Sequence, residues 1–103
     1  MRYDRELILI KQTVSEDNLG NQIIDDTKRS VLCGIKSVGR SEFYAASVEG
    51  LKPELVFTMY QFEYQDESIV EYEGQRYSVI RTYTTGFKEI ELTCEKVIGN
   101  GKN

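Results

Sequence analysis

Hydrophobic and polar residues alternate with a period of two along most of the chain, and this alternation is typical of half-buried β-strands. The clearest case is Ile90, Leu92 and Cys94, which are separated by polar or charged residues. Successive side chains of a strand point to opposite faces, so these three residues are expected to face a core. The same pattern predicts seven strands, at residues 5–13, 22–27, 31–38, 55–62, 69–72, 75–83 and 89–95.

Clusters of turn-forming residues separate the predicted strands. Residues 15–21 include Asn18 and Gly20, which adopt positive φ at low cost, so a hairpin loop is expected there. The pair Glu73-Gly74 predicts a tight hairpin turn, and residues 84–88 predict another turn. Connections of this length leave no room for helical crossovers, so the strands are expected to be antiparallel.

These elements indicate an all-β fold, a small antiparallel β-barrel or sandwich of six to seven strands with one short helix or ordered loop near residues 41–49. A closed barrel would hide the strand edges of a chain with this much β propensity. The length of 103 residues fits one domain, which we expect over residues 1–98. Residues 99–103 are small and polar and are expected to form a disordered tail.

Residues 41–49 are the one helix candidate. Ser41 is the expected N-cap, Glu42 lies in the first turn where the helix dipole favours an anion, and Gly50 is placed for a C′ glycine. The predicted apolar edge of this helix consists of Phe43, Ala46 and Leu51. A helix of about two turns is marginal alone in water, so it needs a surface to pack on and can be mobile until it finds one.

The stretch from Gly39 to Tyr44 combines a glycine, an arginine and two adjacent rings, and it allows two interpretations. In one, it is a strand-to-helix corner with Phe43 inserted into the core. In the other, it anchors an interface, because Arg and Tyr are enriched at binding hot spots. The candidate interface or assembly segment consists of Gly39, Arg40, Ser41, Glu42, Phe43, Tyr44, Gly50, Leu51, Lys52 and Pro53.

Charge and composition narrow the possible functions. The chain carries 13 Lys and Arg against 17 Asp and Glu, a formal net charge of −4, which argues against a protein that grips nucleic acid through its phosphates. Histidine is absent, which excludes the Ser-His-Asp and Cys-His catalytic arrangements and removes the usual nitrogen ligand of zinc.

No apolar run approaches the roughly 20 residues that span a bilayer, and the first residues lack the hydrophobic region of a signal peptide. We therefore expect a protein of a cytoplasm, with no cofactor and no membrane partner.

Four other features of the sequence bear on chemistry. The carboxylate pairs Glu16-Asp17 and Asp25-Asp26 flank one hairpin, but neighbours on a strand point to opposite faces and neither pair converges by itself. A calcium site at residues 16–21 fails the ligand spacing of an EF-hand.

Cys33 and Cys94 are interpreted as buried thiols, with a disulfide as the alternative if their strands are neighbours. Tyrosines and phenylalanines suggest an aromatic platform for stacking bases, although acidic residues surround it; these are Tyr60, Phe62, Tyr64, Tyr72, Tyr77 and Tyr83.

Residues 31–46, VLCGIKSVGRSEFYAA, resemble the central motif of the phage head-tail joining family, the small head-completion or stopper proteins of tailed bacteriophages and prophages. Residues 50–57 and 70–83, followed by Glu91-Leu92, are similar to the Gram-positive branch of that family. The likeness covers nearly the whole chain in the same order. The Asp17–Asn21 turn also lies where these proteins carry an acidic, glycine-containing hairpin.

The resemblance implies a small β-barrel with no enzymatic activity and no catalytic residues to assign. Its expected partners are copies of itself in a ring, the adaptor or portal-side connector protein, and tail proteins. Such a ring would close the DNA-filled capsid, dock the tail and let DNA pass without sequence-specific binding. The expected location is the virion, and the host bacterial cytoplasm during assembly. Two alternatives remain, an OB-like barrel that binds single-stranded nucleic acid or another ligand, and a small enzyme working through Glu and Tyr.

Overall fold

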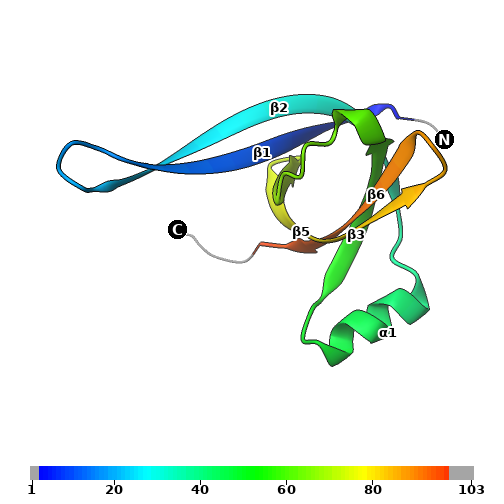
Figure 1. Ribbon diagram of the computed structural model, residues 1–103. Helices are drawn as coiled ribbons and strands as arrows, with labels where there is room; N and C mark the ends of the chain where they lie inside the picture. Colours follow the sequence, from blue (N-terminus) through cyan, green and yellow to red (C-terminus); the bar gives the residue numbers. More distant parts are fainter. Residues whose placement is uncertain (1–2, 98–103) are drawn as a thin grey trace.

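The computed structural model describes residues 3–97, and their strands form one antiparallel sheet that closes into a barrel in the order β1-β2-β3-β6-β5-β4 (Figure 1). This confirms the expected all-β fold with one short helix. The predicted tail at residues 99–103 lies outside the described residues. The elements are β1 (Arg5–Glu16), β2 (Gln22–Lys36), α1 (Arg40–Val48), β3 (Pro53–Tyr60), the 3₁₀ turn η1 (Gln61–Glu63), β4 (Ile69–Tyr72), β5 (Gln75–Thr85) and β6 (Glu89–Lys96).

The prediction of two strands at residues 22–27 and 31–38 is wrong, because β2 runs through both without a break. Its pairing with β1 continues from Gln22 opposite Glu16 to Cys33 opposite Arg5. The charged residues between the two predicted strands do not interrupt the ladder, because Lys28 is exposed to water and the partly exposed Arg29 pairs with the Glu67 carboxylate at 2.7 Å. A second correction is smaller: β3 ends at Tyr60, and Phe62 belongs to η1.

The core fills the inside of the barrel with alternate side chains from all six strands. Phe57 lies at its centre, with its ring centroid 5.5 Å from those of Tyr72 and Tyr77. Such ring pairs add to the free energy gained by burying their apolar area. Ile90, Leu92 and Cys94 all belong to this core, which confirms the inward face predicted for β6.

Both cysteines are free thiols buried in the core, which confirms the interpretation of Cys33 and Cys94 as small hydrophobic residues. Burial disfavours the charged thiolate and raises the pKa of Cys33 to about 11 and that of Cys94 to about 12. Both thiols therefore stay protonated at neutral pH, and the reactive thiolate form is scarce.

Two tight turns follow the sequence prediction. Glu73 and Gly74 both have positive φ, at 52° and 80°, as a two-residue hairpin turn requires. At the β1–β2 turn, the Asp17 carboxylate accepts hydrogen bonds from the backbone N–H groups of Leu19 and Asn21, each at 2.9 Å. Gly20, with φ of 83°, completes this turn. Both hairpins are thus held by local hydrogen bonds and by glycines in the left-handed region.

The β1–β2 hairpin extends well beyond the barrel, and we call its exposed part, residues 11–28, the arm (Figure 1). β4 pairs with β1 only at Ile8–Ile10, and β3 pairs with β2 only from Gly34 onward. The arm is therefore a two-stranded ribbon with no third strand on either side. It accounts for the elongated shape of the molecule, whose principal extents are 48 × 31 × 23 Å.

Candidate assembly interface

The predicted assembly segment, residues 39–53, contains α1 and the two turns beside it. Ser41 is not the N-cap: the helix begins one residue earlier, at Arg40, with Gly39 as its N-cap. Gly39 is extended (φ −66°, ψ 150°), and its carbonyl accepts the first helical hydrogen bond from the Phe43 N–H at 2.9 Å. No side chain caps this end, so the first turn of α1 lacks the stabilisation that a Ser or Asp cap would give.

The C-terminal end of α1 is as the sequence predicts. Gly50 has φ of 80°, its N–H donates to Ser47 O, and the Leu51 N–H donates to Ala46 O, both at 3.0 Å. This pair of bonds is a Schellman motif, which satisfies carbonyls that the end of a helix would leave unpaired. Ala46 is the one buried residue of α1, and both it and Leu51 line a cavity of about 210 Å³ against the barrel wall.

Polar contacts add to the attachment of α1 to the barrel. The Thr93 hydroxyl donates to the Glu42 carboxylate at 2.9 Å, and the Arg81 guanidinium lies 3.7 Å from the same carboxylate oxygen. A β-bulge between Val79 and Arg81 shifts the register of β5 and places Arg81 opposite Thr93. One carboxylate on the helix is thus held by two neighbouring strands.

Phe43 is not in the core, so the interpretation of the segment as a corner with a buried phenylalanine is wrong. The side chain is 41% exposed, and its ring packs edge-on against Tyr44 at a centroid distance of 6.1 Å. Tyr44 and Val48 are more exposed still. Because Ala46 is small, the helix has little apolar area facing the barrel, and its larger apolar side chains face solvent. The interpretation of this segment as an interface stays a prediction.

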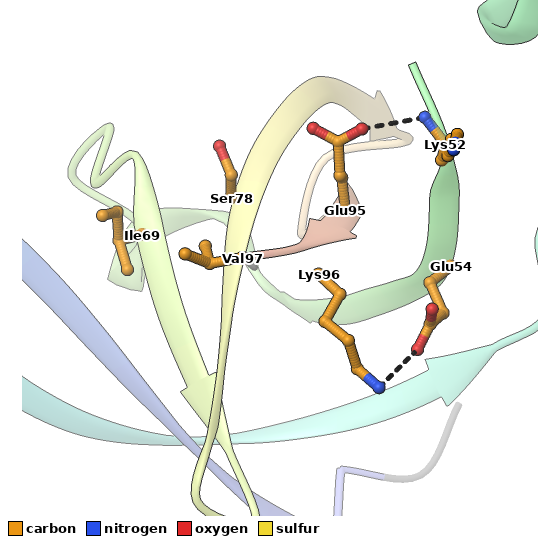
Figure 2. A pocket seen from close by; sticks show the side chains of 7 residues that line it. All are labelled: Lys52, Glu54, Ile69, Ser78, Glu95, Lys96 and Val97. Carbon is orange, nitrogen blue, oxygen red and sulfur yellow. Dashed lines mark hydrogen bonds and ion pairs between the residues drawn. The ribbon is translucent and has the colours of Figure 1, made fainter. Parts of the chain in front are cut away.

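Lys52 and Glu54, which flank Pro53 at the start of β3, line a pocket of about 570 Å³ (Figure 2). The Lys52 N–H donates to the Glu95 carboxylate at 2.8 Å, and Lys96 lies 3.7 Å from the carboxylate of Glu54. Ile69 and Val97 supply apolar lining. The charged groups at the rim are balanced, so this pocket has no concentration of one charge to attract an ionic ligand.

The carboxylates considered for chemistry all lie on the arm. Glu16 and Asp17 are at its end, and Asp26 lies 3.3 Å from the Arg76 guanidinium. Within residues 3–97, no three His, Cys, Asp or Glu side chains are grouped as they would be to hold a metal ion. In the same residues, no helix is long and apolar enough to cross a bilayer.

The aromatic residues considered as a stacking platform are divided among different environments. Tyr72 and Tyr77 are buried in the core, and the Tyr64 hydroxyl donates to the Glu67 carbonyl at 2.6 Å. Tyr60, Phe62 and Tyr83 are exposed. The six residues therefore do not form one surface.

A different aromatic surface forms on the side of the barrel opposite the arm. Tyr3 stacks edge-on against Tyr60 at 4.7 Å between centroids, and the ring of Phe62 lies 5.6 Å from that of Tyr60. Tyr3 and Tyr60 line one shallow pocket with Phe87 and a second with Leu32. We call these five residues the aromatic patch. Tyr3 and Phe87 are remote from Tyr60 in the chain, and their sequence contexts carry no signal for this contact.

Hydrogen bonds fix the patch in place. The Tyr3 hydroxyl donates to the Glu89 carboxylate at 2.6 Å, and the Gln61 N–H donates to the Lys88 carbonyl at 2.6 Å. Partial burial, together with the negative charge of Glu89, raises the pKa of Tyr3. The N-terminal segment and η1 are thereby both tied to the β5–β6 turn.

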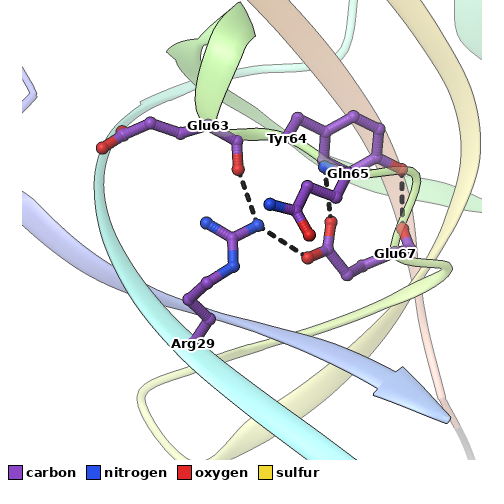
Figure 3. Close-up of polar contacts among 5 residues, drawn as sticks. All are labelled: Arg29, Glu63, Tyr64, Gln65 and Glu67. Atoms are coloured by element: carbon purple, nitrogen blue, oxygen red, sulfur yellow. Dashed lines mark hydrogen bonds and ion pairs between the residues drawn. The ribbon is translucent and has the colours of Figure 1, made fainter.

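The loop from η1 to β4 is fixed by an ion pair between the buried carboxylate of Glu67 and the partly exposed guanidinium of Arg29 (Figure 3). The Arg29 guanidinium donates to the Glu67 carboxylate at 2.7 Å and to the Glu63 carbonyl at 2.6 Å, while the Gln65 N–H donates to the same carboxylate at 2.8 Å. Glu67 is only 3% exposed. Burial opposes its ionisation, but the hydrogen bonds from Arg29 and the backbone outweigh this effect and lower the pKa of Glu67.

The chain matches no model of a known protein family and no curated protein sequence.

The ion pair predicts a pH-dependent stability. Glu67→Gln should lower the free energy of unfolding at pH 7 by about 1.5–3 kcal/mol, because charged hydrogen bonds to a buried group are lost. A carboxyl whose folded pKa is lowered stabilises above its unfolded pKa, near 4.5, and loses that contribution as the pH falls through the folded value. Urea denaturation should therefore show the difference between wild type and variant shrinking as the pH falls below about 4.5.

Glu91→Gln is the matched control, because Glu91 pairs at the same 2.7 Å with Lys36, whose side chain is about half exposed. This substitution should cost less than about 1 kcal/mol at pH 7. Equal losses for the two variants, or a Glu67→Gln loss that does not change with pH, would contradict the role of the ion pair.

The left-handed glycine at the end of α1 gives a second prediction, on the stability of the helix end. At Gly50 a Cβ meets no atom within 4 Å, but φ of 80° is unfavourable for alanine. Gly50→Ala should therefore destabilise the helix end by about 1–2 kcal/mol and speed amide hydrogen exchange at residues 43–51 roughly tenfold. Gly39→Ser is the control, because Gly39 is extended and open, and a serine cap should leave exchange unchanged or slower. Equal exchange in both variants would show that the left-handed glycine is not what ends the helix.

Proposed function

We propose that this protein is a structural subunit of a tailed phage or prophage, which assembles as a ring at the head-tail connector, closes the DNA-filled capsid and docks the tail. The resemblance to the head-tail joining family supports this proposal. The stretch that carries the central motif, residues 31–46, covers the end of β2 and most of α1. The second similar stretch, residues 70–83, covers the β4–β5 hairpin.

The observation that carries the proposal is the arm with its exposed apolar side chains. Val14, Leu19 and Ile24 are largely exposed on a ribbon that contributes nothing to the core. The helix segment and the aromatic patch expose further apolar side chains. Contiguous exposed apolar surface is typical of protein interaction sites, and three such surfaces on one small barrel suit a subunit with several neighbours.

The charge distribution agrees with a wall along which DNA slides. Five basic side chains form ion pairs with carboxylates: Arg29, Lys36, Arg76, Arg81 and Lys96. The net charge of −4 means that carboxylates outnumber basic side chains over the whole chain, which does not favour binding to phosphates. A ring of such subunits would let a duplex pass without holding it.

Residues 39–53 are the proposed contact with a neighbouring subunit or with the adaptor. The helix is short, lacks a side-chain cap at its start and buries one small residue. Such a segment gains order readily when a partner covers Phe43, Tyr44 and Val48.

Hydrogen exchange on the free protein and on connectors purified from phage particles tests this contact. Amides of residues 40–52 should exchange at least tenfold more slowly in the connector, because local opening must then break the intermolecular contact. Core amides such as those of Phe57 and Leu92 serve as the internal control. Equal protection of residues 40–52 in both states would contradict the role of the segment.

The proposal as a whole is tested in a phage or prophage that encodes this chain. A nonsense mutation in the gene should give DNA-filled heads and separate tails in electron micrographs, and expression of the wild-type chain should restore joined particles. Normal particles from the mutant would overturn the proposal.

The exposed rings of the aromatic patch favour one alternative, an OB-like protein that stacks single-stranded nucleic acid. Glu63 and Glu89 lie beside these rings and would repel phosphates. A fluorescence titration with oligothymidine at increasing salt separates the two functions. The connector role predicts no binding at physiological salt, whereas binding that weakens steeply with salt would favour the alternative.

A further inference from the structure

Two unlike apolar surfaces lie at opposite ends of this molecule. Figure 1 shows the arm extending to one side of the barrel, while η1 and the β5–β6 turn, which carry the aromatic patch, lie on the other. Strand β1 connects the two surfaces: Tyr3 of the aromatic patch lies just before the start of β1, and the end of β1 belongs to the arm. We propose that the arm of one copy docks on the aromatic patch of the next copy, so that subunits associate head to tail. This inference rests on the self-assembly in the proposed function and specifies its contact.

The arm presents an apolar face suited to such a contact. Val14 of β1 pairs directly with Ile24 of β2, so their side chains lie together on one face of the ribbon. Leu19, at the end of the arm, is 85% exposed. The hydrogen bonds of the Asp17 turn hold this end in one conformation, so docking loses little conformational entropy.

The charge of the arm argues against pairing with a second arm. The arm contains four carboxylates, at Glu16, Asp17, Asp25 and Asp26, and two lysines, Lys11 and Lys28, at its base, so the outer part of the arm, residues 12–27, carries only negative charge. Hydrogen bonds, chiefly from the backbone of Asn21, lower the pKa of Asp17, which is therefore ionised at neutral pH. Two arms side by side would bring like charges together, so an uncharged or basic surface is the better partner.

The aromatic patch provides a surface of exposed rings, with one cation, Lys88, and two carboxylates, Glu63 and Glu89, at its edge. Phe87 is 99% exposed and Phe62 is 79% exposed, and with Tyr60 they present roughly 350–550 Å² of aromatic surface. This is about half of what one partner buries in a stable interface of standard size. Lys88 lines the same pocket as Phe87 and makes no ion pair within the described residues, so it can receive an arm carboxylate. Glu89, also in this pocket, already accepts hydrogen bonds from Tyr3 and Thr85.

A contact between two different surfaces of the same chain is heterologous. Repeated contacts of this kind generate a ring when the rotation between subunits closes, and an open filament when it does not. The inferred contact therefore has the symmetry that a ring requires. A contact of the aromatic patch with a second patch would instead stop at a dimer.

Disulfide trapping between variants tests the contact without requiring a stable oligomer. Asn18→Cys places a thiol beside Leu19 on the arm, and Gln61→Cys places one in η1 beside Phe62; both positions are exposed. The native thiols of Cys33 and Cys94 are buried and protonated, so they do not compete. The two variants are mixed with oxidised glutathione, and cross-linked dimers are followed over time on non-reducing gels.

The Asn18→Cys and Gln61→Cys mixture should cross-link at least tenfold faster than Asn18→Cys alone, because docking raises the effective concentration of the two thiols. Its cross-linking rate should exceed by the same factor that of a mixture of Asn18→Cys with Lys96→Cys, the control at the exposed end of β6. Adding Leu19→Ser to the arm variant or Phe87→Ser to the patch variant should abolish the difference. Both residues are almost fully exposed, so folding should be unaffected.

Equal cross-linking rates in all mixtures, or a rate unchanged by Leu19→Ser and Phe87→Ser, would overturn the head-to-tail contact. So would faster trapping of Asn18→Cys with Ser47→Cys on α1, which would place the arm on the helix segment. Neither result affects the connector role, because joined phage particles test that role separately. Separate heads and tails from a Phe87→Ser phage, with normal particles from a Tyr83→Ser phage, would further support the contact.

Discussion

The sheet closes where β1 meets β4, through a ladder confined to Ile8, Leu9 and Ile10. On the inner side of this ladder Leu9 lies opposite Val70, and both are fully buried in the core. β4 reaches this position only after the loop that follows η1, and Arg29 holds that loop through the carboxylate of Glu67. Barrel closure therefore depends jointly on a short ladder and an ion pair whose carboxylate is buried. Removing Arg29 is costly because the buried charge of Glu67 is then left uncompensated.

The same two strands serve both the barrel and the arm. In β1, Leu7, Leu9 and Ile10 are buried, and every residue after Ile10 is exposed. A two-stranded hairpin is marginally stable by itself, so the arm takes its stability from the barrel that anchors its base. Because β1 continues without a break from one part to the other, the arm has a defined direction relative to the aromatic patch.

Local patterns in the sequence were sufficient for much of the fold. Alternation located the core face of β6, and glycines marked the Glu73-Gly74 turn and the end of α1 at Gly50, since each needs a conformation that other residues adopt at a cost. Burial that depends on distant residues was not predictable. The break expected within β2 did not occur, because Lys28 remains in water and Arg29 pairs with Glu67, a residue of a distant segment.

The candidate surfaces show the same contrast between features set by local sequence and features set by distant residues. Local preferences favoured Ser41 as the N-cap, but the chain leaves β2 in an extended conformation that continues to Gly39, and the helix begins immediately after it. The aromatic patch joins Tyr3, Tyr60 and Phe87 from three distant segments, and only closure of the barrel brings them together. The exposed apolar residues of the arm are visible in the sequence, but alternation cannot tell an arm in water from a strand against a core.

The two-stranded ribbon also has a mechanical consequence. Its six residues beyond Ile10 in β1 extend about 20 Å from the wall, at roughly 3.3 Å per residue. At that length, a tilt of about 10° at the base moves the tip by about 3.5 Å, while every backbone hydrogen bond within the ribbon stays intact. Such a tilt changes the position of the tip without deforming the barrel from which the ribbon projects.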